Sequence, residues 1–271
     1  MTTTVHGVES VLRRCRDEGR AALVGYLPVG FPTLEGSLEA MRVLVDAGCD
    51  VIEVGVPYSD PLMDGPVIQH AAATALAGGT RVDDVFRATA TVHEAGGSAL
   101  VMTYWNLVMR RGVERFAADL AASGGSGMIT PDLIPEEADE WVAASDRHGL
   151  DRVFLVAPSS TPERLTKATR ACRGFVYAAS TMGVTGARTS VDGDARGLVE
   201  RTRVVTDLPV CVGLGVSNGA QAAELAAYAD GVIVGSALVR TLSGPGELPD
   251  RLDALRALTT ELADGVRTRR R

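Results

Sequence analysis

The segment Val51-Ile52-Glu53-Val54-Gly55-Val56 decides the fold, because it is apolar on both faces except for one carboxylate. Strands that are apolar on both faces are typical of parallel sheets that helices cover. An amphipathic, helix-like stretch (34–47) and a turn with Gly48 and Asp50 precede it. This order of helix, turn and apolar strand predicts one unit of an α/β protein.

The same unit recurs along the chain and predicts eight strands, at 21–28, 51–56, 99–104, 127–130, 153–157, 175–178, 210–213 and 231–234. Between them, apolar residues with a helical period predict helices, for example at 34–47, 113–122, 135–148 and 220–228. Eight such units favour closure into a (β/α)8 barrel, the TIM barrel of the α/β class. An open, doubly wound sheet is the alternative, and the lack of a nucleotide-binding glycine pattern after the first strand disfavours it.

Two helices beyond the eight units are expected. One, at 5–18, would cover the bottom of the barrel, and another, at 82–94, would be inserted after the second unit. No linker or shift in composition interrupts the chain, so we expect a single domain over 1–271.

The composition excludes several classes of protein. Hydrophobic residues make up 46% and charged residues 23%, and the formal charge of -7 gives no broad positive field for nucleic acid. The basic run 267–271 is expected to be a solvated tail. The four cysteines have no spacing typical of metal ligands, and no export signal or membrane-length apolar run occurs. We therefore expect a cytoplasmic protein that binds neither membranes nor metal.

Glu53 is the first candidate catalytic residue. Side chains alternate along a strand, so Glu53 points into the barrel if Ile52 and Val54 face the helices. A carboxylate among apolar side chains loses hydration, which raises its pKa and suits a group that both gives and takes a proton. A structural Glu paired with a cation is the alternative, and the absence of Lys and Arg from 43–70 disfavours it.

The loop 57–66 carries a second carboxylate, Asp64. This loop is longer than the usual βα connection of about 2 to 6 residues, and its three prolines stiffen it. Asp64 could merely close a turn or cap the next helix. The nearby Glu53 favours a catalytic role.

Glycines after the last two predicted strands, in Gly213-Leu214-Gly215 and Gly235-Ser236-Ala237, predict a phosphate site. Barrels commonly bind phosphate in these loops and at the N-terminus of a short extra helix. Glycine lets backbone N–H groups approach the anion closely. The sixth loop, 180–188, is long and glycine-flanked, so we expect a lid, with an ordinary surface loop as the alternative.

With these segments in place, the chain resembles the tryptophan synthase α subunit family over nearly its whole length. Three motifs carry the resemblance, in the family's order: Glu53-Val54-Gly55-Val56-Pro57-Tyr58-Ser59-Asp60-Pro61-Leu62-Met63-Asp64-Gly65-Pro66, Gly183-Val184-Thr185-Gly186 and Gly235-Ser236-Ala237. The resemblance implies a lyase of L-tryptophan biosynthesis. Such an enzyme cleaves indole-3-glycerol phosphate to indole and glyceraldehyde 3-phosphate by a retro-aldol reaction, with no cofactor on this chain.

The resemblance also implies a role for each matching residue. Glu53 would protonate the indole ring carbon, and Asp64 would bind the indole N–H and stabilise the developing positive charge. The residues implied to contact the rest of the substrate are Tyr26, Tyr104, Tyr177, Thr185 and Leu214, with Asn106 in the same segment as Tyr104. Those implied to hold the phosphate are Gly186, Gly213, Gly215, Gly235 and Ser236. Tyr26 and Leu214 stand where phenylalanines are frequent in the family.

The partner that the resemblance implies is a β subunit that carries pyridoxal phosphate, in an α2β2 heterotetramer through which indole passes. Asp60, Leu133 and Ile134 would lie at this interface, and Ile134 stands where the family often has proline. Three alternatives stay open: a stand-alone lyase that releases free indole, another phosphate-binding barrel of aromatic amino-acid metabolism, and a regulatory subunit without turnover.

Overall fold

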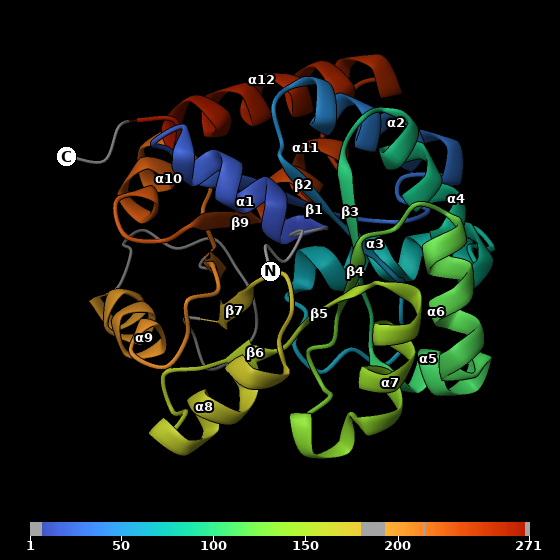
Figure 1. Cartoon of the computed structure of the whole chain (residues 1–271). Helices are drawn as coiled ribbons and strands as arrows, with labels where there is room; N and C mark the ends of the chain where they lie inside the picture. The colour runs from blue at the N-terminus through green and yellow to red at the C-terminus, as the bar shows by residue number, and fades with distance from the viewer. Residues whose placement is uncertain (1–6, 180–192, 214, 269–271) are drawn as a thin grey trace.

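The computed structural model describes residues 7–179, 193–213 and 215–268. Within these ranges, parallel strands form one sheet, and helices surround it (Figure 1). The strands are β1 (Ala22–Pro28), β2 (Val51–Gly55), β3 (Ser98–Met102), β4 (Gly127–Ile129), β5 (Asp151–Val153), β6 (Leu155–Val156), β7 (Val176–Ala179), β8 (Val210–Gly213) and β9 (Gly231–Val234). The helices are α1 (Val8–Asp17), α2 (Leu34–Asp46), α3 (Pro66–Ala77), α4 (Val82–Glu94), α5 (Trp105–Arg111), α6 (Val113–Ala122), η1 (Pro135–Glu137, a 3-10 helix), α7 (Asp139–His148), α8 (Pro162–Ala171), α9 (Gly193–Arg203), α10 (Gly219–Ala226), α11 (Ser236–Leu242) and α12 (Leu248–Val266).

The predicted (β/α)8 barrel is confirmed, with one difference at the fifth strand. The strand order is β5-β4-β3-β2-β1-β9-β8-β7-β6, so the first and last members of the sheet are β5 and β6. These two are consecutive in the chain and only Phe154 separates them. β5 pairs with β4 and β6 pairs with β7, so the chain itself closes the barrel where the sequence predicted one strand over 153–157.

The ladder is interrupted at Phe154 because its N–H bonds to a side chain. Its carbonyl still accepts a hydrogen bond from the Tyr177 N–H at 3.2 Å, but its own N–H donates to the Cys172 thiol at 3.4 Å. A side chain thus takes the place of a strand partner.

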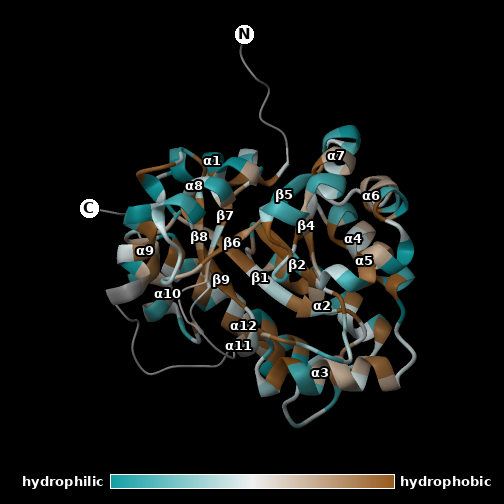
Figure 2. Cartoon of the chain, turned by 90° about the horizontal axis from the view of Figure 1, so that it is seen from below, coloured by the Kyte–Doolittle hydropathy of each residue, from teal (hydrophilic) through white to brown (hydrophobic). Residues whose placement is uncertain are grey.

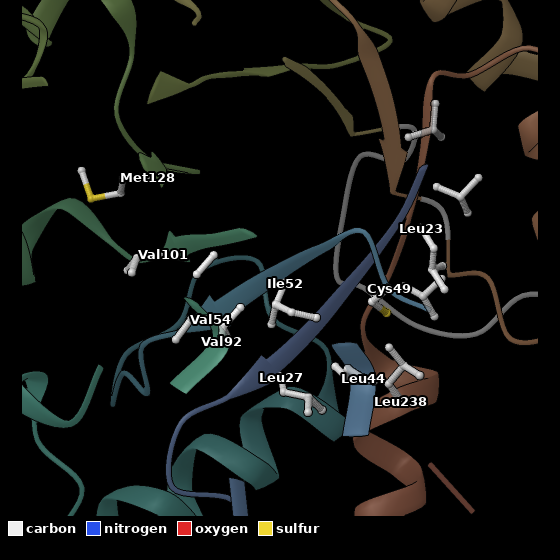
Figure 3. Close-up of a cluster of buried hydrophobic side chains, with 14 of the residues drawn as sticks. Leu23, Leu27, Leu44, Cys49, Ile52, Val54, Val92, Val101, Met128 and Leu238 are labelled. Atoms are coloured by element: carbon white, nitrogen blue, oxygen red, sulfur yellow. The ribbon is translucent and has the colours of Figure 1, made fainter. Parts of the chain in front are cut away.

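Two apolar clusters separate the inside of the barrel from its outer layer. The inner cluster takes one or two residues from each unit, among them Val24, Val51, Leu100, Ile129, Val153, Phe175, Cys211 and Ile233. The outer cluster lies between strands and helices, where Ile52 and Val54 of β2 lie near Leu44 and Val92 (Figure 3). In Figure 2 the central strands are largely hydrophobic and hydrophilic residues gather on the helices around them.

The expected N-terminal helix is present as α1, which lies beside β1 and β9 (Figure 1). Its buried residues Val8, Val11, Leu12 and Cys15 join the inner cluster, so α1 closes the end of the barrel where the strands begin. It starts at Val8, not at 5, and residues 5 and 6 lie outside the described ranges.

The second unit contains two helices, as expected, but their roles are exchanged. α4 has the predicted bounds and packs on β2 and β3 between α2 and α6, so it is the outer-layer helix of this unit. α3 is therefore the additional helix, and it packs against β1 and α11. Gly65 and Pro66 start α3 directly after the loop that carries Asp64.

The described residues contain no helix that is both long and apolar enough to cross a membrane. Over the same ranges, no three His, Cys, Asp or Glu side chains gather in a group that could hold a metal ion.

Candidate active site

Glu53 lies inside the barrel. The alternation predicted for β2 is confirmed, because Val51 belongs to the inner cluster and Ile52 and Val54 to the outer one. Glu53 is only 1% exposed, and its Oε1 has no hydrogen-bond partner in the described part of the chain. None of the ion pairs found within the described ranges involves it. Burial raises the pKa of its carboxyl to about 8, so Glu53 is largely protonated at neutral pH.

Two tyrosines cover Glu53 from the barrel mouth. Tyr26 of β1 is in register with Glu53, and its ring fills the space where a side chain at Gly55 would project. Tyr177 of β7 fills the corresponding space at Gly213 in the same way. Burial first, and then the carboxylate charges, raise the pKa of both hydroxyls well above the ordinary value. Both glycines are therefore required by packing, and they allow two aromatic rings to exclude water from Glu53.

Tyr104 holds the loop that carries Asp64. Its hydroxyl accepts hydrogen bonds from the N–H groups of Leu62 and Met63, each at 3.1 Å. Burial raises the pKa of the Asp64 carboxyl, and a hydrogen bond with the Tyr104 hydroxyl opposes this rise. Gln69 donates to the Asp64 carbonyl at 2.8 Å. The loop is thus held by specific hydrogen bonds in addition to its prolines.

The sequence-predicted residues of β1, loop 57–66 and the third unit meet in one pocket. It is lined by Tyr26, Val56, Asp64, Met102, Thr103, Tyr104 and Pro131. Asn106 does not line it but donates to the Tyr58 hydroxyl at 3.3 Å, and the Tyr58 and Tyr104 rings lie 5.1 Å apart. Tyr26, Asp64 and Tyr104 therefore face one another, whereas Asn106 supports the loop from outside.

The glycines predicted for a phosphate site lie at the ends of two neighbouring strands. β8 and β9 pair in register, with Gly213 opposite Ile233, so Gly215 and Gly235 follow adjacent strands. Gly215 has a φ of 57°, a conformation that favours glycine. Ser236 begins the short α11, which precedes α12, and the Tyr26 ring lies next to Gly235. This arrangement matches the loops and extra helix in which barrels bind phosphate.

Three expected site residues, Thr185, Gly186 and Leu214, lie outside the described ranges, as does the expected lid at 180–188.

The expected interface residues differ in exposure. Asp60 is exposed and accepts a hydrogen bond from the Ser59 hydroxyl at 2.6 Å. Ile134 is 49% exposed, whereas Leu133 is 4% exposed and packs in the outer cluster. Leu133 therefore supports its loop from within.

The sequence predicted the segment 131–135 at the partner interface but not the contact by which Asp132 connects this loop to the third unit. Its carboxylate accepts the N–H of Trp105, the first residue of α5, at 3.0 and 3.1 Å. A carboxylate that accepts from a helix N-terminus leaves no local signal in the sequence when the two segments are 27 residues apart.

Comparison with known proteins places the chain in a family. The family model for the tryptophan synthase alpha chain matches residues 12–267. The alpha chain of Mycobacteroides abscessus is 63% identical over 258 residues, which cover 95% of this chain and 96% of that relative. The alpha chain of Nocardia farcinica is 64% identical over 253 residues, 93% of each chain.

Solved structures agree with these sequence relatives. A structure of Mycobacterium tuberculosis tryptophan synthase matches with a TM-score of 0.91 at 60% identity, covering 97% of this chain and 99% of that one. The alpha subunit from Legionella pneumophila matches with a TM-score of 0.87 at 30% identity, covering 96% and 97%. The chain therefore belongs to the tryptophan synthase alpha chain family.

Proposed function

We propose that this chain cleaves indole-3-glycerol phosphate to indole and glyceraldehyde 3-phosphate, with Glu53 as its proton donor and acceptor and Asp64 as its electrostatic partner. As a tryptophan synthase alpha chain it is a lyase of tryptophan biosynthesis. The observation that supports these roles best is Glu53, a buried carboxyl with an unpartnered oxygen and a pKa of about 8. Such a group can hold a proton at neutral pH and also release it.

The reaction follows from these two carboxyl groups. Protonated Glu53 donates to the indole ring carbon that bears the glycerol chain, and positive charge develops at the ring nitrogen. The ionised Asp64 stabilises this charge through the indole N–H. The carbon–carbon bond then breaks, its electron pair restores the aromatic ring, and the adjacent hydroxyl loses its proton as it becomes the aldehyde. Glu53, ionised after its first transfer, takes up that proton.

The other expected residues complete the binding site. The backbone around Gly213, Gly215, Gly235 and Ser236, together with Gly186, would hold the phosphate next to Tyr26. Tyr177 and Tyr104, with Thr185 and Leu214, would enclose the indole. No metal or organic cofactor is needed for these proton transfers, so we expect none on this chain.

We further propose that the chain works with a β subunit carrying pyridoxal phosphate, in an α2β2 heterotetramer in the cytoplasm. The structural relatives from Mycobacterium tuberculosis are of tryptophan synthase, and Asp60 and Ile134 are exposed on loops of the barrel mouth. All four cysteines are buried and free, as suits a reducing compartment.

Indole release by the purified chain, with and without a β subunit, tests this function. We expect slow release alone and faster release with the partner. Glu53→Gln and Asp64→Asn should each lower indole formation by at least about 100-fold, while both still bind a non-cleavable indole-3-alkyl phosphate. Turnover like that of the wild type in either variant would rule out the catalytic assignment. A rate that is already full without the partner would favour the stand-alone lyase.

A further inference from the structure

The hydroxyl of Tyr26 has no role in the reaction described above. It takes part in none of the hydrogen bonds found among the described residues, whereas the Tyr104 hydroxyl bonds to Leu62, Met63 and Asp64. Tyr26 is only partly buried and lines the pocket together with Asp64. A phenylalanine ring would fill the same space over Gly55, so packing alone does not account for the hydroxyl.

The Tyr26 hydroxyl lies beside the start of the loop that carries Asp64. Gly55 is the last residue of β2, and the loop with Asp64 starts directly after it. Because Gly55 has no Cβ, the Tyr26 hydroxyl reaches its Cα, and Tyr26 and Asp64 line the same pocket. The titratable groups that face the hydroxyl are Asp64, Glu53 and Tyr104. Burial first, and then these neighbours, raise the pKa of the hydroxyl, so it stays protonated and remains a hydrogen-bond donor.

Asp64 has room for this donor. A carboxylate offers about four acceptor positions. The Tyr104 hydroxyl uses one of them, and the indole N–H would use another. A second hydroxyl would favour the ionised form of Asp64, which burial otherwise disfavours.

We propose that Tyr26 is a positioning residue for Asp64: in the substrate complex its hydroxyl donates a hydrogen bond to the Asp64 carboxylate and holds it, ionised, toward the indole N–H. This inference rests on the proposed function, because it needs an indole at the site. Tyr26 contributes through Asp64 and exchanges no proton with the substrate.

Ligand binding tests the inference without turnover. The probes are a non-cleavable indole-3-alkyl phosphate and its benzofuran analogue, in which an oxygen replaces the N–H. Wild type should prefer the indole ligand, Asp64→Asn should lose most of this preference, and Tyr26→Phe should reduce it about threefold or more. Tyr228→Phe is the matched control, because it removes a tyrosine hydroxyl that lies outside the pocket and has no hydrogen-bond partner among the described residues, and it should leave the preference unchanged.

Steady-state kinetics provide the second readout. Tyr26→Phe should lower kcat/KM for indole release about tenfold, as expected for one hydrogen bond to a charged group. It should also move the acidic limb of the pH profile of kcat upward, because this profile reports the substrate complex, in which Asp64 loses a donor that favours its ionised form.

The outcomes separate this inference from the proposed function. If wild type itself shows no preference for the N–H ligand, the proposed function fails and the inference fails with it. If wild type shows the preference and Tyr26→Phe keeps it in full, the inference alone fails. A loss of rate in Tyr26→Phe that is equal at every pH would also overturn it, because a purely structural role predicts that result.

Discussion

At the scale of single residues, the chemistry of Glu53 comes from its neighbours along and across the strand. Val51 lies below it in the inner cluster, and Gly55 leaves the space above it to the Tyr26 ring. Its carboxyl is buried and forms none of the ion pairs found among the described residues, and this burial raises its pKa to about 8. Burial also raises the pKa of the Asp64 carboxyl, but the hydrogen bond with the Tyr104 hydroxyl opposes this rise. The proposed roles use this difference, with Glu53 holding a proton and Asp64 ionised.

Glu53 should also make stability depend on pH. Its folded-state pKa of about 8 lies above the ordinary value of about 4.3 expected in the unfolded chain. Between these pH values the folded protein binds more protons than the unfolded chain, so stability falls as the pH rises through this window. Glu53→Gln should abolish this contribution. Its free energy of unfolding, relative to wild type, should rise between pH 5 and pH 8.5 by on the order of 3 kcal/mol.

Denaturant unfolding at the two pH values measures this difference. Glu39→Gln, on the exposed face of α2, is the control and should change unfolding about equally at both. If the free energies of unfolding of Glu53→Gln and wild type differ by the same amount at both pH values, Glu53 is not protonated in the folded state at neutral pH.

At the scale of elements, α1 shows how a side chain at the start of a strand fixes a helix. Asp151 begins β5, is 3% exposed, and accepts the N–H of Val8, the first residue of α1, at 2.8 Å. Gly7 has a φ of 72° and packs against the same carboxylate as the chain turns into the helix. Burial raises the pKa of Asp151 to about 6, and Arg173, 3.7 Å away, opposes this rise.

Asp151→Ala should therefore destabilise the protein by about 2 kcal/mol, because it leaves the Val8 N–H buried without a partner. Amide hydrogen exchange in α1 should increase. Asp151→Asn keeps an acceptor for the Val8 N–H and should therefore lose less stability than Asp151→Ala. Indole release below the unfolding temperature should stay near the wild-type rate, because Asp151 lies at the end of the barrel opposite to the site. Unchanged exchange in α1 in the alanine variant would show that the apolar contacts alone hold this helix.

At the scale of the whole molecule, one end of the barrel is closed by packing and the other carries the candidate site. α1 and Asp151 close the end where the strands begin. At the other end, Asp64 follows β2, and Gly215 and Gly235 follow β8 and β9. The loops at this second end also expose large apolar side chains, among them Leu62 and Ile134. Exposed apolar residues beside a site are typical of a surface that binds another protein.

Ile134→Asp should weaken the stimulation of indole release by a β subunit at least about tenfold, because a charge would be placed in a desolvated contact. Release by the chain alone, and its unfolding, should change little. Val204→Asp is the matched control. Val204 is 83% exposed and lies directly after α9, at the opposite end of the barrel. Its substitution should therefore leave the stimulation by the β subunit unaffected. Equal losses in both variants would argue against an interface at Ile134.

Much of this architecture could be predicted from residues that are near one another in the chain. The alternation of β2 places Glu53 inside, the bounds of α4 and α6 agree with the apolar period, and the glycines of the last two units lie at strand ends as expected. The split of the fifth strand was not predictable, because it depends on the Cys172 thiol, 18 residues away. The exchanged roles of α3 and α4 depend likewise on which helix reaches β3.

Local periodicity and spacing along the chain are enough to predict the class of fold, the inward direction of Glu53 and the loop that carries Asp64. The surroundings of the two carboxyl groups depend on residues that are brought together by folding. Tyr26 and Gly55 are 29 positions apart, and Tyr104 reaches Leu62 across 42, yet these contacts exclude water from one carboxyl and orient the other. The pKa of a buried carboxyl depends on its neighbours in space. These neighbours come together only in the folded barrel, so the sequence alone does not reveal them.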